Sequence, residues 1–280
     1  MRKFAVYVLI LALSLVINSS VWAANLSVRI DAAHFPDPHF REYVKYFDSN
    51  GDGILSDKEI AAVRSISEGG YDVLSLAGIE YFTNLEYLST GTSPNLTKLD
   101  VSRNTKLKEL RTSSTNLIEL NISGCTELQY LELYAKLSNL DLSNCKKLQY
   151  LSLEVHEISN LDLSNSKELI KLSIVSRNLN HLDLSNNIKL QGLYCNCYSS
   201  CYNRGNLDNL DLSRNTELQS LGCNYSKITK LDLSNNKKLT HLDISHNSIQ
   251  NLDLSNNINL QYLQCISTSL DVLDLSNNII

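Results

Sequence analysis

The sequence predicts a repeat solenoid, in which the chain winds into similar short coils that stack beside one another. The first observation is a motif of the form Leu-Asp-Leu-Ser-Asn, which recurs nine times at steps of 20, 21 or, once, 28 residues. A coil of this length is too short to bury its own leucines, so neighbouring coils must stack to make a core. The second position of the motif falls at Asp100, Asn121, Asp141, Asp162, Asp183, Asp211, Asp232, Asp253 and Asp274.

The second observation is that each coil contains two stretches in which apolar residues alternate with polar ones. In one coil these stretches run from Leu239 to Ile249 and from Leu252 to Leu254. Alternation with a period of two is typical of a strand that buries one face. We therefore expect two short strands per coil and a parallel sheet on each broad side of a flattened solenoid.

The repeated residues resemble a known family. Leu239-x-x-Leu242-x-Ile244-x-x-Asn247-x-Ile249 is similar to the leucine-rich repeat pattern, and the nested form of about 21 residues looks like a bacterial subclass. The segment 78–85 is similar to the start of the repeats in internalin-type surface proteins. The resemblance covers about residues 71–280 and implies a leucine-rich repeat fold. By analogy it also implies adhesion or host interaction.

Residues 1–23 have the pattern of a cleavable signal peptide. A basic start is followed by an apolar run from Phe4 to Ile17 and by small residues at Val21-Trp22-Ala23. No later apolar run reaches the ~18 residues of a membrane span. We therefore expect a secreted or cell-surface protein without a transmembrane span. Cleavage leaves 23 basic and 30 acidic residues, a net charge of −7, which disfavours nucleic acid and anionic membranes as partners.

Residues 48–59 predict a calcium-binding loop. They match the EF-hand pattern D-x-[DN]-x-[DN]-G-x5-E at every specified position. Calcium is a hard cation that takes oxygen ligands, and Gly53 permits the sharp turn that gathers them. The alternative is a solvated, Asx-rich turn without metal. The expected ligands are the side chains of Asp48, Asn50, Asp52 and Glu59, the backbone carbonyl of Ile54, and Ser56 through water.

The segments around the loop predict a small α-helical cap over residues 24–70, ahead of a solenoid over residues 71–280. A hydrophobic solenoid end needs such a cap, and we expect calcium to rigidify it over the first coil. No second loop matches the pattern, which favours a structural calcium site over a sensor. The apolar surface for docking is expected from Val63, Ile66, Val73, Leu76 and Ile79.

The two expected sheets differ in their outward side chains. The Leu-Asp-Leu strands carry Asp at the outward position in every copy except Asn121, and Ser follows two residues later in all nine. We interpret this column as structural, because Asp and Ser can satisfy backbone groups in a turn; a cation-binding ladder is the alternative. The other sheet varies its outward residues, and solenoids use such faces for binding. The candidate ligand anchors there are Tyr130, Tyr134, Tyr150 and Tyr194, unless these tyrosines merely pair along the sheet.

The 28-residue step contains an insertion near 195–205, which is either a contact loop or a tolerated insertion without a role. Cys197 and Cys201 in this loop are the favoured disulfide pair, and zinc binding at the loop cysteines is a weaker alternative. The other five cysteines fit small buried hydrophobes: Cys125, Cys145, Cys195, Cys223 and Cys265.

The sequence contains no Ser/His/Asp spacing, phosphate-binding loop or zinc-hydrolase motif, so we expect no enzyme. The favoured function is that of a secreted or surface-exposed, calcium-binding bacterial protein that recognises a protein or a glycan. The alternative is a self-assembling scaffold that associates end to end, because the sequence stops at Ile280, one motif into a coil. A hydrolase is a third and weaker alternative.

Overall fold

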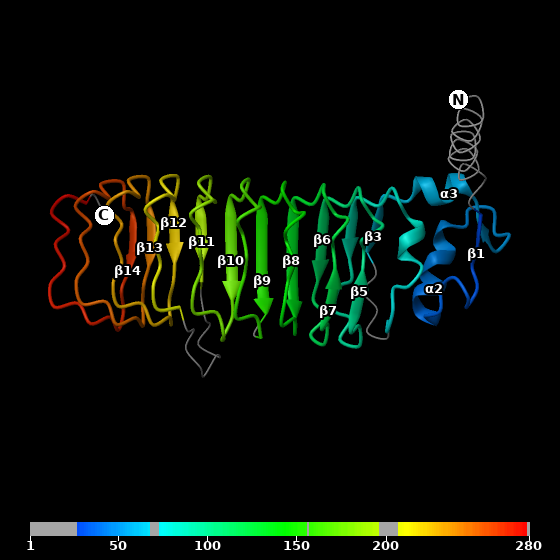
Figure 1. Ribbon diagram of the computed structural model, residues 1–280, viewed down its shortest axis with the longest axis horizontal. Helices are drawn as coiled ribbons and strands as arrows, with labels where there is room; N and C mark the ends of the chain where they lie inside the picture. The colour runs from blue at the N-terminus through cyan, green and yellow to red at the C-terminus, as the bar shows by residue number, and fades with distance from the viewer. Residues whose placement is uncertain (1–26, 68–72, 156, 196–206, 279–280) are drawn as a thin grey trace, which may run out of the picture.

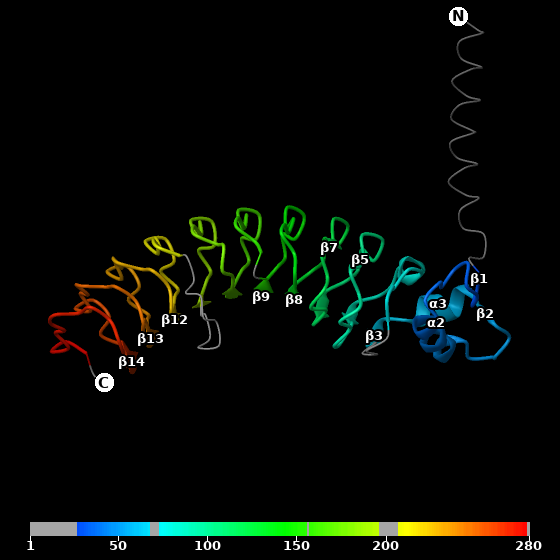
Figure 2. The same ribbon diagram turned by 90° about the horizontal axis from the view of Figure 1, so that it is seen from below.

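The computed structural model describes residues 27–67, 73–155, 157–195 and 207–278. Figure 1 shows a row of stacked coils that runs from a small helical segment to the C-terminal end, and Figure 2 shows that the row bends into an arc. The predicted solenoid is therefore confirmed. The predicted signal peptide, the insertion loop from residue 196 onwards, Cys197 and Cys201 all lie outside the described residues.

The helical segment at the N-terminal end is held by two capped helices and a short antiparallel pair of strands. Its elements are β1 (Val28–Arg29), α2 (Pro38–Val44), η1 (Lys45–Phe47), β2 (Ile54–Leu55) and α3 (Asp57–Ala62). The Asp37 carboxylate caps α2 by accepting hydrogen bonds from the backbone N–H groups of His39 and Phe40. A capping box of Ser56 and Glu59 starts α3.

Ten parallel strands form one sheet along the inner, concave side of the arc (Figure 2). The sheet begins at Ser65, inside the range predicted for the cap. From the N-terminal end its strands are β3 (Ser65–Ser67), β4 (Tyr87–Ser89), β6 (Glu109–Thr112), β8 (Tyr130–Ala135), β9 (Tyr150–Val155), β10 (Lys171–Val175), β11 (Gly192–Tyr194), β12 (Ser220–Gly222), β13 (His241–Asp243) and β14 (Tyr262–Gln264).

The prediction of two strands in every coil is wrong, and among the described residues the second parallel sheet has two strands. Within the described residues, the outer, convex side contains one parallel pair, β5 (Lys98–Asp100) and β7 (Glu119–Asn121), preceded by the short helix η2 (Ile79–Tyr81). The later Leu-Asp-Leu segments are not paired as strands. The arc explains the difference, because coils that are hydrogen-bonded along the inner side diverge toward the outer side. Backbone hydrogen bonds need strands about 4.8 Å apart.

The leucines of both alternations point inward and form one continuous core with the helical segment. The apolar residues expected to dock that segment, Val63, Ile66, Val73, Leu76 and Ile79, are all buried. The junction also has a polar contact, since the second Asp37 oxygen accepts hydrogen bonds from Leu74 N at 2.7 Å and Ser75 N at 3.1 Å. Burial raises the pKa of Asp37, but the backbone N–H groups of Phe40, Leu74, Ser75 and His39 lower it further, so the net pKa lies below its usual range.

A buried asparagine ladder joins the coils at the position that directly follows the Leu-Asp-Leu-Ser-Asn motif. The amide of Asn236, for example, donates to Leu212 O at 3.1 Å and to Asn215 O at 2.9 Å in the preceding coil. Each of these carbonyls also accepts a backbone N–H within its own turn, from Asn215 N at 3.0 Å and from Leu218 N at 3.1 Å. The amide therefore adds a second hydrogen bond to each carbonyl and links the two coils. Equivalent amides donate in the same way at Asn104, Asn187, Asn215, Asn257 and Asn278. Among the described residues, no helix has the length and apolar character that crossing a membrane requires.

Candidate functional site

A hollow of about 340 Å³ lies on the concave sheet where β8, β9, β10 and β11 run side by side. The outward side chains of these strands line it, because alternate residues of a strand point to the same face. The register explains how they meet: Tyr130 lies beside Tyr150, which lies beside Lys171 on the next strand. The lining consists of Tyr130, Tyr150, Leu151, Ser152, Lys171, Ser173 and Tyr194. We call this site the concave hollow.

One wall of the concave hollow is a tyrosine pair fixed by charged neighbours. The rings of Tyr130 and Tyr150 lie 6.0 Å apart between centroids at an interplanar angle of 30°. The Arg111 guanidinium lies 4.3 Å from the Tyr130 ring centroid, which is a cation–π distance. Glu132 accepts hydrogen bonds from Arg111 at 3.1 Å and from the Tyr130 hydroxyl at 3.0 Å. Burial and this hydrogen bond to Glu132 both raise the pKa of Tyr130, so its hydroxyl stays protonated and holds the ring in place.

The opposite wall is formed by Tyr194 and Lys171. The Lys171 ammonium lies 5.1 Å from the centroid of the Tyr194 ring. Gly192 makes room for this ring, because a Cβ at that position would lie 3.2 Å from Tyr194 Cε2. Between the two walls the floor is low, since the short side chains of Ser152 and Ser173 lie beside each other in register.

Three of the four predicted anchors meet at this site. Tyr130, Tyr150 and Tyr194 line the concave hollow, whereas Tyr134 lies further along β8 and outside its lining. The prediction omitted Lys171 and the two serines of the floor. They stand in the same outward columns as the tyrosines, and the strand register was the available signal. Only the sheet showed that the small residues separate the aromatic walls.

The predicted calcium loop is held by its own side chains. The two Asp48 carboxylate oxygens accept hydrogen bonds from Gly51 N at 2.9 Å and Gly53 N at 2.8 Å. Asp52 accepts from Ile54 N at 2.8 Å, and Asn50 accepts from Asp52 N at 3.0 Å. Gly51 and Gly53 have φ of 71° and 79°, a region that glycine enters without strain. The loop thus holds three side chains with potential metal-ligating oxygens, those of Asp48, Asn50 and Asp52, on one tight turn.

Glu59, the last expected ligand, spans the loop. Its Oε1 accepts hydrogen bonds from the Ser49 backbone N–H at 2.8 Å and from the Ser49 hydroxyl at 2.6 Å. Its Oε2 accepts equivalent bonds from Ser56 at 2.9 Å and 2.8 Å. Donation first from Ser49 and then from Ser56 lowers the pKa of Glu59 to about 2. The carboxylate is therefore ionised over the whole neutral range.

The fit of this loop to calcium is partial. The donors are all oxygen, as calcium requires, and a carboxylate oxygen that accepts a hydrogen bond keeps a further lone pair. Yet within the described ranges no three His, Cys, Asp or Glu side chains are gathered closely enough to hold a metal ion. Asp48, Asn50, Asp52, the Ile54 carbonyl, Ser56 and Glu59 therefore supply suitable donors, but the acidic ones are not brought together.

The strand β2 of this loop pairs with β1, whereas in paired EF-hands it would pair with the loop of the second hand. Val28 of β1 lies opposite Leu55, and Arg29 lies opposite Ile54, in an antiparallel pair. Both Val28 and Leu55 are buried. The single loop is thus joined to the fold through the segment that precedes it in the chain.

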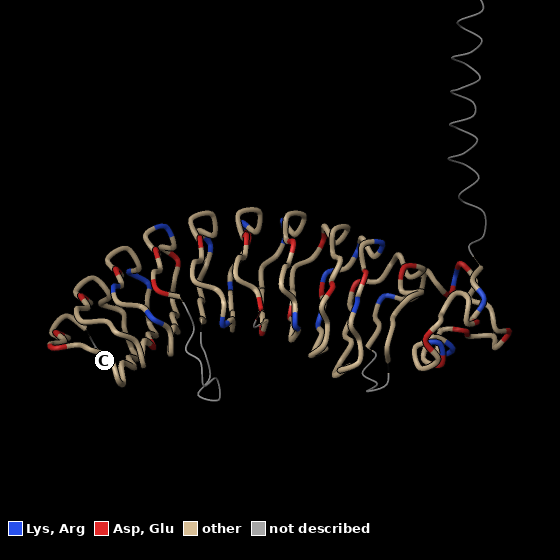
Figure 3. The backbone as a smooth tube through the Cα atoms, turned by 60° about the horizontal axis from the view of Figure 1, so that its bottom comes forward, with Lys and Arg blue, Asp and Glu red and all other residues tan. Residues whose placement is uncertain are grey.

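The Asp column of the convex side is structural, as we favoured. In each of eight coils the Asp carboxylate accepts a hydrogen bond from the backbone N–H of the serine two residues later, as Asp232 does from Ser234 at 2.9 Å. Donation from the serine backbone and hydroxyl holds the pKa of Asp232 below its usual range. Figure 3 shows acidic and basic residues interspersed along the coils rather than segregated to one face.

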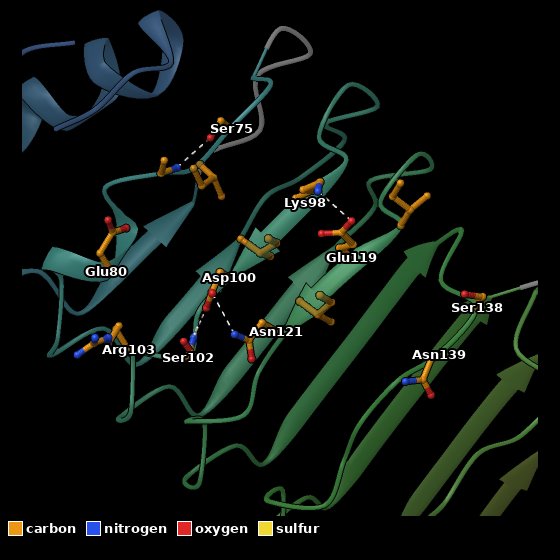
Figure 4. A pocket seen from close by; sticks show the side chains of 15 residues that line it. Ser75, Glu80, Lys98, Asp100, Ser102, Arg103, Glu119, Asn121, Ser138 and Asn139 are labelled. Carbon is orange, nitrogen blue, oxygen red and sulfur yellow. Dashed lines mark hydrogen bonds and ion pairs between the residues drawn. The ribbon is translucent and has the colours of Figure 1, made fainter. Parts of the chain in front are cut away.

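A wider hollow of about 940 Å³ lies over β5 and β7 on the convex side. Figure 4 shows that its polar side chains face one another: Lys98 pairs with Glu119 at 2.9 Å, and Asn121 donates to Asp100 at 3.0 Å. These charges neutralise each other at the surface. We therefore regard this hollow as a consequence of the short two-stranded sheet and not as the candidate site.

The described cysteines are free thiols. Cys125 and Cys145 replace asparagine in the buried ladder, and Cys125 Sγ donates to Val101 O at 3.3 Å. Burial raises the pKa of Cys125 to about 12 and that of Cys145 to about 11, so neither thiol is reactive near neutral pH. The hydrogen bond with Cys195, followed by burial, raises the pKa of Cys223. Cys125, Cys145 and Cys223 are buried, as we expected, whereas Cys195 and Cys265 are only partly buried.

The geometry described above defines a leucine-rich repeat solenoid, and solved structures agree. The functional domain of InlJ from Listeria monocytogenes, which includes a cysteine ladder, is 30% identical at a TM-score of 0.78; the match covers 90% of this chain and 54% of that one. The internalin InlF from Listeria monocytogenes is 24% identical at a TM-score of 0.62, with 90% and 82% covered. Toll, in the Drosophila Toll–Spätzle complex, is 20% identical at a TM-score of 0.57, with 73% and 30% covered.

These comparisons place the chain among leucine-rich repeat solenoids whose structural neighbours include Listeria internalins. The chain spans about half the length of the InlJ chain. The similarity to InlF and to Toll lies below 25% identity and shows the fold alone. No protein-family model matches the chain, and no curated protein matches it in sequence.

Proposed function

We propose that this chain is a secreted or surface-exposed bacterial binding protein that recognises another protein through the concave hollow. The observation that carries this proposal is the meeting of Tyr130, Tyr150 and Tyr194 around one depression of the concave sheet. Interfaces are enriched in tyrosine, and most binding energy comes from a few anchors that fill pockets. The similarity to the functional domain of InlJ supports the solenoid architecture on which this proposal rests.

Recognition is tested by probing the chain against arrays of extracellular proteins and of glycans. Tyr150→Ala should weaken binding to a recovered ligand by at least about tenfold, the usual loss for an anchor worth about 1.4 kcal/mol or more. Tyr46→Ala is the matched control, because Tyr46 is 83% exposed and lies in η1, away from the concave hollow. Equal binding by both variants would refute the role of the hollow, and a ligand found only among the glycans would favour the glycan alternative.

The second part of the proposal is that calcium binds the 48–59 loop and stiffens the helical segment. The support is the all-oxygen donor set on a turn that its own hydrogen bonds already shape. Calcium would compete with Ser49 and Ser56 for the Glu59 carboxylate. The loop contacts the solenoid core through Leu55, so ordering it would stabilise the first coils.

Calorimetric titration with calcium, followed in parallel by thermal melting, tests this part. We expect a dissociation constant on the order of 10⁻⁴–10⁻³ M and a higher melting temperature with calcium. Glu59→Gln should abolish both effects, whereas Asp57→Asn, a non-ligand position of the same loop, should preserve them. Wild-type protein that gives neither heat nor a shift in melting temperature would leave the loop as a metal-free turn.

Self-assembly is the second candidate function. Its support is a group of exposed apolar side chains in the last described coils, with Ile258, Ile266 and Val272 at 56%, 57% and 78% exposure. Contiguous exposed apolar residues can mark an association surface. Light scattering at micromolar concentration tests it, and a monomer there would refute self-assembly while leaving the concave hollow unaffected.

A further inference from the structure

Among the described residues, several hydrogen-bond donors that line the concave hollow have no partner. Within the described ranges, the Lys171 ammonium makes no ion pair and contacts the face of the Tyr194 ring. The hydroxyls of Ser152 and Ser173 on the floor, and of Tyr150 and Tyr194 on the walls, likewise have no hydrogen-bond partner among the described residues. One cation and four hydroxyls therefore face a common space.

The acidic side chain on β8 in register with Ser152 is already engaged. Glu132 lies next to Ser152 in register, but its carboxylate is held by the Arg111 guanidinium and the Tyr130 hydroxyl. Arg111 in turn also binds Glu109. On the β6 and β8 side two carboxylates thus share the Arg111 guanidinium, whereas among the described residues Lys171 on the β10 side has no carboxylate partner. A bound ligand that brings an acceptor with negative charge would complement this arrangement.

The ring faces favour a peptide over a sugar as the source of that charge. Sugars and bases stack on open aromatic faces, but one face of Tyr130 is covered by Arg111 and one face of Tyr194 is covered by Lys171. Each cation thus occupies a ring face on which a sugar would otherwise stack. Beyond Tyr194 the outward residues Gly192, Ser220 and Gly222 are small, which leaves a low path along the sheet for an extended chain.

We propose that the concave hollow binds an acidic side chain, Asp or Glu, of an extended segment of the protein partner, with its carboxylate on the Lys171 ammonium and the hydroxyls of Ser152 and Ser173. The tyrosine rings enclose the apolar part of that side chain. This inference rests on the proposed function, because it names the chemistry by which the same site recognises its partner.

A single selection separates the two claims. A phage-displayed library of random linear peptides is selected on the full chain, and the enriched peptides are then measured by fluorescence anisotropy on four proteins. These are the wild type, Tyr150→Ala, Lys171→Gln and the control Lys230→Gln. Lys230 is exposed and precedes a Leu-Asp-Leu segment on the convex side, so its substitution removes the same charge from the opposite face.

We expect the enriched peptides to share an Asp or Glu. Their affinity should fall about tenfold in Lys171→Gln, the loss typical of one hydrogen bond to a charged group, and should be unchanged in Lys230→Gln. Replacing the shared acid by its amide should remove the difference between wild type and Lys171→Gln. Unchanged melting temperatures would show that each variant is folded.

The contrary outcomes are distinct. Peptides that depend on Tyr150 but carry no shared acid, or that bind Lys171→Gln as well as wild type, overturn the inference and leave the proposed function standing. Equal weakening by Lys171→Gln and Lys230→Gln overturns it as well, because binding would then follow net charge alone. If no peptide distinguishes wild type from Tyr150→Ala, both claims fail.

In a parallel experiment, 3′-sialyllactose is tested on the same four proteins. Lys171-dependent binding of this sugar without any acidic peptide would assign the site to a sugar carboxylate and overturn the inference.

Discussion

The concave and convex sides of the arc are made by the same coils but follow different rules. On the concave side the strands of a ten-stranded sheet satisfy one another's backbone groups. The outward side chains are therefore not needed to satisfy the backbone, and they vary from coil to coil. On the convex side the sheet stops after β7, and side chains take over the pairing of the backbone. Asp, Ser and Asn recur there because every coil has the same backbone groups to satisfy.

The comparison shows where the sequence was free to acquire function. A column that repeats, such as the Asp and Asn positions, reports a backbone requirement of the fold. A column that varies, such as the one holding Tyr130, Tyr150 and Lys171, indicates no such backbone requirement, because the hydrogen bonds between parallel strands already satisfy the strand backbone. Breaking a repeated position should therefore affect stability, and breaking a variable one should affect recognition.

The largest expected effect is at the buried ladder. Asn236→Ala removes two buried hydrogen bonds that join adjacent coils, so we expect a loss of about 2 kcal/mol in the free energy of unfolding. Urea denaturation measures it. Asn235→Ala, at the exposed neighbouring position, is the control and should change little. Asn236→Cys should cost less than Asn236→Ala, because Cys125 shows that a thiol can donate at this position. Equal stability of wild type and Asn236→Ala would contradict the structural role of the ladder.

Acidification should weaken the convex side next. The pKa values of these Asp carboxylates lie below their usual range because the serine N–H and hydroxyl groups favour the ionised form. A carboxylate with a depressed folded pKa stabilises the protein above its unfolded pKa, and this stability is lost as pH falls through the folded value. The melting temperature should therefore fall below about pH 4. Asp232→Asn should keep the turn, as Asn121 does with Ser123, and make the fall shallower. An unchanged slope in this variant would argue against the contribution of Asp232.

The smallest effect on stability is expected at Gly192. Its added Cβ in Gly192→Ala would press on Tyr194 Cε2 at 3.2 Å and Lys171 Cγ at 3.5 Å, which are flexible side-chain atoms rather than backbone. We expect a nearly unchanged melting temperature together with weaker binding at the concave hollow, because the Tyr194 wall must move. Ser220→Ala, beside Gly192 on β12, is the control. A marked loss of stability without any change in binding would place Gly192 among the structural positions instead.

The sequence was informative where chemistry repeats. The coil length, the inward leucines and the structural role of the Asp column all follow from the spacing of residues in the chain. The convergence of Tyr130 and Tyr150 also followed, because equal steps place equivalent positions on neighbouring strands. The second sheet was predicted wrongly because alternation shows which side chains are buried but not how far apart the coils lie. Tyr134 lies outside the lining of the concave hollow for a related reason, since position along a strand decides which outward residues share a hollow.

By itself the sequence determined that the chain is a solenoid, which face of each strand is buried, and which columns are free to vary, because burial and backbone satisfaction impose the same requirement on every coil. The tertiary structure decided what periodicity cannot encode. The bend of the arc confined the sheet to the concave side, β1 took the place of a second loop beside β2, and the register of β10 against β11 put Lys171 on the Tyr194 ring. Each of these depends on the distance between segments, which only the packed chain sets.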